Sequence, residues 1–250
     1  MTWVDLRVRD TGLRELMDDP DCDLAGLRHT YAQFRVVNRL VTGWRQVYRQ
    51  RIRPLLKIDQ TATLLDIGSG GGDLARALAC WARQDGFELA VTAIDPDDRA
   101  HAYAVAQTQT PGVTFRQAGS AVLVAEGAQF DVVVSNHLLH HLDAAELAEL
   151  MADSDRLARR LVVHNDIARG RIAYAAYAVA SQPFGRRSFI HVDGLRSIRR
   201  SYRAQELAEV LVEPWRVVRQ FPARVLVLRD GRVGATAPQR ARPASGSISP

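Results

Sequence analysis

The spacing of apolar residues divides the chain into two parts. From Leu24 to about Ile52, apolar side chains recur at helical spacing, which predicts one long helix. After Pro54 the spacing changes, and short apolar runs alternate with helical patterns. The three valines at 132–134 show no polar alternation, as expected of a strand buried on both faces of a parallel sheet. The pattern therefore predicts an α/β domain preceded by a helical segment.

The alternating part predicts both strands and helices. The predicted strands are residues 63–67, 89–95, 113–118, 130–136, 161–166, 216–221 and 225–229. The predicted helices are residues 73–83, 98–109, 143–157, 169–182 and 204–212, with a loop over 183–193. Asp143 and Glu146, three residues apart, form the pattern of a capping box at the start of one helix. Because strands and helices alternate, we predict a doubly wound sheet with helices on both faces.

The chain divides into three regions. Residues 1–56 are predicted to form an N-terminal arm and a lid helix, with residues 1–23 loosely ordered because acidic and basic residues alternate there. Residues 57–233 form the main domain, and a helical cap is inserted at about residues 169–200. Residues 234–250 are rich in alanine, proline and serine, which predicts a disordered tail.

Composition narrows the class of protein. The 250 residues are 47% hydrophobic and 24% charged, which is typical of a globular protein and excludes disorder throughout. The longest nearly apolar stretch, residues 172–180, is far shorter than the ~18 residues that a membrane-spanning helix needs. Charged residues near the N-terminus argue against a signal peptide, and Cys22 and Cys80 match neither a disulfide framework nor a zinc site. We therefore expect a cytoplasmic protein with no membrane span.

The basic residues are almost all arginine. The net charge is +5, and Lys57 is the only lysine among 33 basic residues. Such a charge suits an anionic partner of some kind. However, aromatic and basic residues do not interleave as they do in proteins that bind single-stranded nucleic acid. We therefore predict no nucleic-acid partner.

The strongest chemical signal is a glycine-rich loop between a predicted strand and a predicted helix. Its sequence is Asp-Ile-Gly-Ser-Gly-Gly-Gly-Asp over residues 66–73, and its glycines let the backbone approach a ligand closely. A dinucleotide fingerprint needs a glycine where Asp73 stands, and an acid there repels a pyrophosphate. The loop therefore predicts a nucleotide-like ligand other than a dinucleotide. The candidate ligand-binding residues are Asp66, Gly68, Ser69, Gly70, Gly72 and Asp73.

Two segments carry a family resemblance that covers roughly residues 60–170. The spacing Asp66-x-Gly68-x-Gly70-x-Gly72 resembles motif I of class I S-adenosylmethionine-dependent methyltransferases. Residues 130–142 resemble the strand-four motif of small-molecule methyltransferases related to those of quinone biosynthesis. The resemblance implies a Rossmann-like, seven-stranded methyltransferase sheet. It also implies S-adenosylmethionine as the cofactor, with S-adenosylhomocysteine as its product.

The resemblance assigns further cofactor contacts. Asp95, followed by Pro96, ends the second strand where the family places an acid against the ribose hydroxyls. Asn136 and His137 end the fourth strand, beside the sulfonium methyl. The acid that many members carry after the third strand is absent here, so Ser120 or backbone groups are expected to contact the adenine.

Missing residues narrow the reaction. The fourth strand is followed neither by the Asp/Asn-Pro-Pro-Tyr sequence of DNA amino methyltransferases nor by a cysteine nucleophile. A small acceptor remains, and we expect O-methylation of an aromatic, phenolic or quinol-like hydroxyl. C-methylation of a polyketide or other aromatic compound and a non-catalytic, cofactor-binding partner protein are the alternatives. The chain is expected to be a monomer or homodimer.

Histidines are the candidate acid–base groups. A phenol with a pKa of about 10 loses its proton more easily beside an imidazole, whose pKa is about 6.5. We expect His140 or His191 to serve as this base, and His191 is preferred because a cap residue can close over the acceptor. Other residues expected to contact the acceptor are Tyr31, Asn38, His141 and Asp166, and Arg186, Arg187 or Arg196 would stabilise a phenolate. No acid or cysteine lies at ligand spacing from the histidines, so no metal is predicted.

Overall fold

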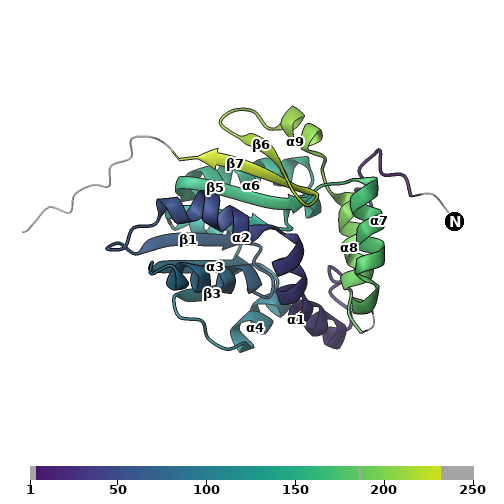
Figure 1. The fold of residues 1–250 in the computed structure, drawn as a ribbon, viewed down its shortest axis with the longest axis horizontal. Coiled ribbons are helices and arrows are strands. Elements are labelled where there is room, and N and C mark those ends of the chain that lie inside the picture. The colour runs from purple at the N-terminus through teal and green to yellow at the C-terminus, as the bar shows by residue number, and fades with distance from the viewer. Residues whose placement is uncertain (1–3, 186, 232–250) are drawn as a thin grey trace, which may run out of the picture.

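The computed structural model describes residues 4–185 and 187–231, so Arg186 and the predicted tail at 234–250 lie outside the described residues. A seven-stranded sheet occupies the centre of this part of the chain, in the order β3-β2-β1-β4-β5-β7-β6 (Figure 1). The strands are β1 (Ala62–Ile67), β2 (Leu89–Asp95), β3 (Val113–Gln117), β4 (Phe130–Asn136), β5 (Ala158–Ile167), β6 (Arg216–Gln220) and β7 (Arg224–Asp230). The first five are parallel to one another, and β7 pairs antiparallel with both β5 and β6.

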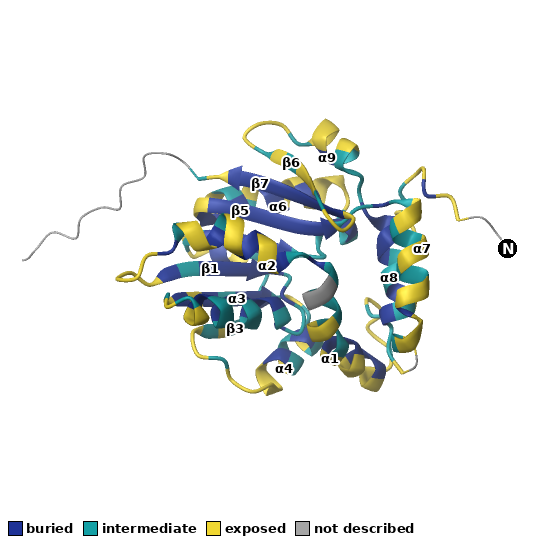
Figure 2. Cartoon of the chain, viewed as in Figure 1, coloured by how far each residue is buried: buried dark blue, intermediate teal, exposed yellow. Residues whose placement is uncertain are grey.

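Helices cover both faces of the sheet because its central strands are apolar on both sides. Leu64 of β1 packs into a core with α3 (Asp73–Gln84), whereas the next residue, Leu65, packs into the core on the opposite face. That second core includes α5 (Ser120–Ala125), α6 (Ala144–Leu157) and α9 (Ala204–Val210). Figure 2 shows the central strands as the most deeply buried elements. This arrangement is the predicted doubly wound sheet, and all seven predicted strands are confirmed.

The N-terminal helix is interrupted where one long helix was predicted. α1 ends at Val41, after starting at Leu24, and α2 (Trp44–Val47) begins after Gly43. Gly43 has a φ of 68°, and the Nε2 atom of Gln220 lies 2.1 Å from where a Cβ would stand. The chain then continues through a π-helical turn, η1 (Tyr48–Ile52), and a 3-10 turn, η2 (Arg53–Leu55). A left-handed glycine therefore separates the lid helix from the segment packed against the sheet.

The arm that precedes α1 is packed, which corrects the expectation of loose order for its described residues. No helix or strand forms over residues 4–23, yet Leu6 is 5% exposed and Glu15 is 4% exposed. The backbone N–H groups of Leu16 and Met17 donate to the Asp193 carboxylate at 2.7 and 3.0 Å. Buried polar contacts over long sequence separations hold the arm, and charge alternation alone does not reveal them.

The cap consists of two helices and a short 3-10 turn. α7 (Arg171–Ala180) and η4 (Gln182–Phe184) lead to α8 (Ile190–Arg200), part of which was predicted as loop. The hydrophobic pattern did not predict the whole of α8, because several buried positions of this helix are polar, namely Asp193, Ser197 and Arg200. Figure 1 shows α7 and α8 side by side beyond the carboxyl ends of the parallel strands.

α4 (Asp98–Ala106) and a 3-10 turn after β4, η3 (Leu139–His141), complete the described elements. The capping box predicted at Asp143 and Glu146 is confirmed. Among the described residues, no helix has the length and apolarity needed to cross a membrane.

Candidate active site

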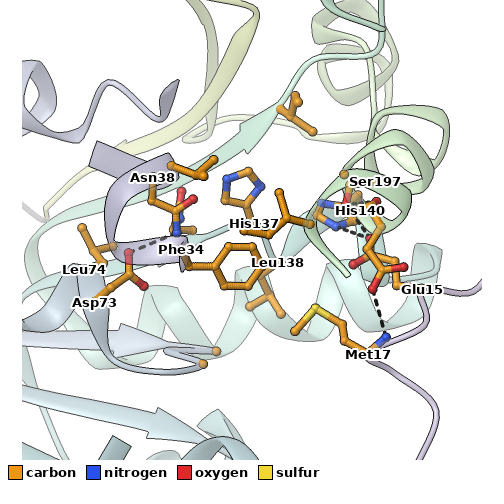
Figure 3. A pocket seen from close by; sticks show the side chains of 18 of the residues that line it. Glu15, Met17, Phe34, Asn38, Asp73, Leu74, His137, Leu138, His140 and Ser197 are labelled. Atoms are coloured by element: carbon orange, nitrogen blue, oxygen red, sulfur yellow. Dashed lines mark hydrogen bonds and ion pairs between the residues drawn. The ribbon is translucent and has the colours of Figure 1, made fainter. Parts of the chain in front are cut away.

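One pocket joins the carboxyl ends of the parallel strands to the cap. Its cavity volume is about 470 Å³, and it extends from the glycine loop to α7 and α8. Figure 3 shows Asn38 and Asp73 on one side, Glu15 and His140 on the other, and His137 between them. Ligands of open α/β sheets bind in this position, outside the carboxyl ends of the strands. The pocket is therefore the candidate active site.

The glycine loop has the backbone conformation that its sequence predicted. Gly68, Gly70 and Gly72 have φ angles of 67°, 51° and 77°, which side chains rarely allow. A Cβ at Gly72 would also lie 2.4 Å from the ring of Phe115. Gly72 caps α3 and does not line the pocket, whereas the other two glycines do. The loop thus presents backbone atoms to a ligand at the pocket's edge.

Three carboxylates surround this loop. Asp66, Asp73 and Asp95 all line the pocket, and burial raises the pKa of each. Their charges also repel, since Asp73 and Asp95 further raise the pKa of Asp66. The Oδ2 atom of Asp66 is buried without a hydrogen-bond partner. A cationic ligand relieves both the repulsion and the unpaired atom, whereas a pyrophosphate worsens the repulsion.

Asp95 also supports the loop itself. One of its oxygens accepts the Gly70 N–H at 2.8 Å, and the other accepts the Asp97 N–H at 2.9 Å. Each carboxylate oxygen retains a lone pair for a further donor. Pro96 and Ser69 line the pocket beside it. Asp95 therefore lines the pocket with free lone pairs, and its contact with ligand hydroxyls remains a prediction.

Two residues predicted to contact the acceptor, Tyr31 and Asn38, line the pocket and also contact the glycine loop. Asn38 donates to Asp73 at 3.1 Å. The Tyr31 ring lies 5.1 Å from that of Tyr103, and a Cβ at Gly71 would contact the Tyr103 ring and the Cβ of Tyr31. α1 therefore covers the glycine loop as well as the acceptor side of the pocket.

Ser120 does not reach the pocket in this structure. Its Oγ atom donates to Asp153 at 2.7 Å, and the residue is not among those lining the cavity. The position after β3 starts α5 and turns the hydroxyl toward α6. The position of Ser120 therefore does not support its predicted contact with the adenine.

His140 is held between two carboxylates. Its Nδ1 atom lies 2.9 Å from Asp166 Oδ1, and its Nε2 atom lies 3.1 Å from Glu15 Oε1. Carboxylates only accept, so both ring nitrogens carry protons in this arrangement. Burial alone would lower the pKa of His140, but Asp166 and Glu15 outweigh it and raise that pKa to about 9. The side chain is 1% exposed, yet it lines the pocket.

Asp166 lies behind His140 and does not line the pocket. It accepts the His140 backbone N–H at 2.8 Å as well as the ring N–H. Burial would raise its pKa, but the charge and hydrogen bond of His140 hold that pKa well below the usual range. Asp166 therefore orients His140, which replaces the expected direct contact with the acceptor.

A buried arginine, Arg224, favours the neutral form of a second histidine in the pocket, His137. Arg224, at the start of β7, is 2% exposed and contacts the His137 Nε2 atom at 3.3 Å. A guanidinium only donates, so this nitrogen accepts. Burial, followed by the Arg224 charge, lowers the pKa of His137 well below its usual value. His137 is thus a neutral ring beside a buried cation.

Asn136 lies next to this pair. Its Oδ1 atom accepts from Trp44 Nε1 at 2.9 Å and from Arg224 at 3.2 Å. Asn136 and His137 both line the pocket, at the end of β4 where they were predicted. Their side chains are fixed by α2 and by the start of β7.

The structure places His191 away from the pocket. Its Nδ1 atom lies 2.7 Å from Ser181 Oγ, and the residue does not line the cavity. Because α8 begins at Ile190, His191 turns toward η4 and not toward the acceptor side. Arg196 likewise donates to the backbone oxygen of Arg14 at 2.7 Å. His191 is therefore not placed to act as the predicted base, whereas His140, the other predicted candidate, lines the pocket.

Sequence reasoning missed Glu15 and Arg224. Glu15 meets His140 across 125 positions, and no periodicity reports such a contact. Arg224 had one available signal, namely a charged residue at the edge of a strongly apolar strand. The reason given for predicting no metal, that the histidines lack acidic partners, is also wrong, because Glu15 and Asp166 are supplied by distant segments.

Comparisons with known proteins show which class of protein this chain resembles. The family model of the methyltransferase domain matches residues 64–161. No curated protein matches the chain at a significant level. A plantazolicin methyltransferase, BpumL, in complex with SAH aligns with a TM-score of 0.62 at 13% identity, covering 87% of this chain and 93% of that one.

Two further solved structures share the fold. Human N-acetylserotonin methyltransferase in complex with SAM aligns with a TM-score of 0.58 at 12% identity, covering 84% of this chain and 57% of that one. The structure showing conversion of a disulfide bond into a thioacetal group during echinomycin biosynthesis aligns with a TM-score of 0.50 at 19% identity, covering 76% and 82%.

These findings identify a methyltransferase domain in this chain. The domain match, the sheet order and the glycine loop agree on this class. The predicted methyltransferase domain and its Rossmann-like fold are thereby confirmed, and S-adenosylmethionine remains the predicted cofactor. The described chain adds a packed N-terminal arm and a two-helix cap to this α/β domain, and both line its pocket.

Proposed function

We propose that this enzyme methylates a hydroxyl group of a small, largely apolar aromatic acceptor. The observation that carries the proposal is the continuity of the pocket. The same cavity that begins at the glycine loop ends in an apolar chamber with ionisable side chains at its base. A cofactor and an acceptor held in one cavity react as neighbours, which removes much of the entropic cost of the encounter.

The residues at the loop fit the cofactor. S-adenosylmethionine carries an ammonium group and supplies a methyl group activated by its sulfonium charge. Asp66 and Asp73 are suited to the cationic groups, and Asp95 is suited to the ribose hydroxyls. The buried Asp66 oxygen that lacks a hydrogen-bond partner is a further observation that favours binding of a cationic group at this loop.

The acceptor chamber is apolar along its helical walls. The wall residues from α1, α7 and the strand ends are Phe34, Val37, Val41, Leu138, Ile167, Ala173, Ala176, Tyr177 and Ala180. Small alanines on α7 leave width for a flat ring, and the aromatic and aliphatic side chains stabilise its burial. Such walls support an aromatic acceptor over a polar one.

Side chains at the base of the chamber are suited to remove the acceptor's proton and to stabilise the negative charge that forms. His140 is oriented by Asp166, and its Nε2 proton is shared with the Glu15 carboxylate, so we assign removal of the acceptor's proton to the His140–Glu15 pair. Arg224 adds a buried positive charge beside His137, and a phenolate forming nearby is stabilised by it. In this proposal, Arg224 stabilises the phenolate, the role predicted from the sequence for Arg186, Arg187 or Arg196.

The proposal is tested by incubating the chain with methyl-labelled cofactor and matched phenols, quinols and their O-methylated forms. Mass spectrometry detects transfer, and NMR of the product distinguishes an O-methyl from a C-methyl group. Labelled O-methyl product supports the proposal. Label on a ring carbon favours the C-methylation alternative, and cofactor binding without turnover across the panel favours a non-catalytic partner.

Asp95→Ala is expected to weaken S-adenosylhomocysteine binding by about 2–3 kcal/mol, roughly 30- to 150-fold. The substitution removes a charged acceptor that already orders the loop through Gly70. Calorimetric titration measures the change, with Ser120→Ala as the control because its hydroxyl bonds Asp153. Unchanged affinity in folded Asp95→Ala, or an equal loss in both variants, would contradict the assignment.

Cofactor affinity is expected to rise with pH over the range in which the loop carboxylates titrate in the free protein. Burial raises the pKa values of Asp66, Asp73 and Asp95, so part of this set is protonated before binding. A bound cation favours the charged carboxylates, so binding releases protons. Calorimetry in two buffers with different ionisation enthalpies measures that release. Proton uptake, or affinity that falls with pH in this range, would exclude the cation assignment.

A further inference from the structure

Two neighbouring histidines share the same arrangement. His140 Nδ1 lies 2.9 Å from Asp166 Oδ1, and His141 Nδ1 lies 3.3 Å from Asp18 Oδ2. The opposite ring nitrogens of both residues turn toward one carboxylate. His140 Nε2 lies 3.1 Å from Glu15 Oε1, and His141 Nε2 lies 3.9 Å from Glu15 Oε2.

This arrangement is typical of metal-binding histidines. A histidine that ligates a metal almost always donates its other ring N–H to a carboxylate or carbonyl group, which fixes the ring and its tautomer. Here two such histidine–carboxylate pairs converge on a third acidic side chain. Two imidazoles and one carboxylate form a donor set suited to first-row divalent metals such as zinc and iron.

We propose that His140, His141 and Glu15 bind one divalent first-row metal ion. The ion is held by the two Nε2 atoms and the Glu15 carboxylate, while Asp166 and Asp18 orient the rings. The donor atoms of the three residues all lie within 4.8 Å of one another.

The distances suit a shared ion. Two donors that are each about 2.1 Å from one ion lie about 3.0 Å apart at a right angle and about 3.4 Å apart at the tetrahedral angle. The 3.1 Å between His140 Nε2 and Glu15 Oε1 falls in this range. The 3.9 Å between His141 Nε2 and Glu15 Oε2 reaches it after a ring shift of about half an ångström.

The surroundings support binding from the pocket side. Glu15 and His140 are 4% and 1% exposed, and Ser197 donates to Glu15 Oε1 at 2.7 Å. All three proposed ligands line the pocket, so further coordination positions face the chamber. Arg200 pairs with Asp18 at 3.2 Å and offsets part of the negative charge. On binding, the ion replaces the His140 Nε2 proton, which leaves to solvent, and no electron is transferred.

The site also defines a property of the acceptor, which rests on the proposed function. An acceptor oxygen that enters the chamber can fill an open coordination position. A bound divalent ion lowers the pKa of a coordinated hydroxyl and so favours its reactive, deprotonated form. In the metal-loaded protein the ion therefore takes over the removal of the acceptor's proton, and His140 acts as one of its ligands. The enzyme should therefore prefer acceptors whose hydroxyl has a second oxygen beside it, because two adjacent oxygens chelate the ion.

The test measures metal binding directly, without cofactor or acceptor. Untagged chain is stripped with chelator and titrated with Co²⁺, followed by competition with Zn²⁺. We expect one ion per chain and visible Co²⁺ absorption from nitrogen and oxygen ligands. His141→Gln and Glu15→Gln should each lower Zn²⁺ affinity by about 100-fold or more. His29→Gln, an exposed histidine on α1, serves as the matched control and should bind normally.

Circular dichroism and S-adenosylhomocysteine binding establish that the variants are folded. His141→Gln is the decisive variant because Glu15 keeps its contacts with His140 and Ser197. Absence of stoichiometric binding, or equal affinity in wild type and His141→Gln, would overturn the metal site. Such a failure leaves methyl transfer untouched, whereas metal binding without methyl transfer would overturn only the proposed function.

Discussion

His140→Gln is expected to lower turnover by about 10²–10⁴-fold while cofactor affinity stays near that of wild type. Glutamine keeps a polar side chain of similar reach but cannot exchange a proton at an imidazole nitrogen. His140 does not contact the glycine loop, since its partners are Asp166 and Glu15. Single-turnover assays with a saturating acceptor measure the change, and calorimetry with S-adenosylhomocysteine measures cofactor affinity.

His191→Gln is the matched control for this experiment. His191 bonds Ser181 outside the pocket, so its replacement should leave turnover within about threefold of wild type. The opposite result, a large loss in His191→Gln with full turnover in His140→Gln, would return the acid–base role to the cap. A raised KM with unchanged kcat in His140→Gln would make His140 a binding group only.

Asp166→Ala is expected to reduce the free energy of unfolding by about 3–5 kcal/mol. The carboxylate accepts from the ring and the backbone of His140, and its loss leaves buried donors without acceptors. Urea unfolding followed by circular dichroism measures the difference. Asp166→Asn, which keeps an acceptor oxygen but loses the charge, should give a smaller loss.

Asp59→Ala provides the control for stability. Asp59 is exposed in the turn before β1, so its replacement should change the free energy of unfolding by no more than about 0.5 kcal/mol. A loss under about 1 kcal/mol in Asp166→Ala would mean that water readily replaces the carboxylate. The contact between β5 and η3 would then be a minor contribution to stability.

The cofactor side of the site could be predicted from the sequence because its chemistry is local. Asp66, Gly68, Gly70 and Asp73 lie within eight consecutive residues, and the strand and helix that flank them have strong periodic patterns. A strand that leads through glycines into a helix has few possible geometries. Asp95 follows from the same logic, since parallel neighbours β1 and β2 end at one edge of the sheet.

The sheet could be predicted for the same reason, whereas the cap could not be predicted in full. Apolar runs such as those of β2 and β4 specify buried strands, and both strands were predicted with the bounds that the structure shows. α8 buries Asp193, Ser197 and Arg200 against partners in the arm. A helix stabilised by polar contacts to a distant segment has no apolar stripe to mark it.

Sequence alone therefore determined the doubly wound fold, the class of enzyme and the cofactor loop, because periodicity and closely spaced motifs act over a few residues. Only the tertiary structure decided which histidines line the pocket. It brings Glu15 from the arm and Asp166 from β5 to the two nitrogens of His140, and it turns His191 toward Ser181. These contacts join segments 10 to 125 positions apart. Their geometry depends on how the arm and cap pack, which no local pattern encodes.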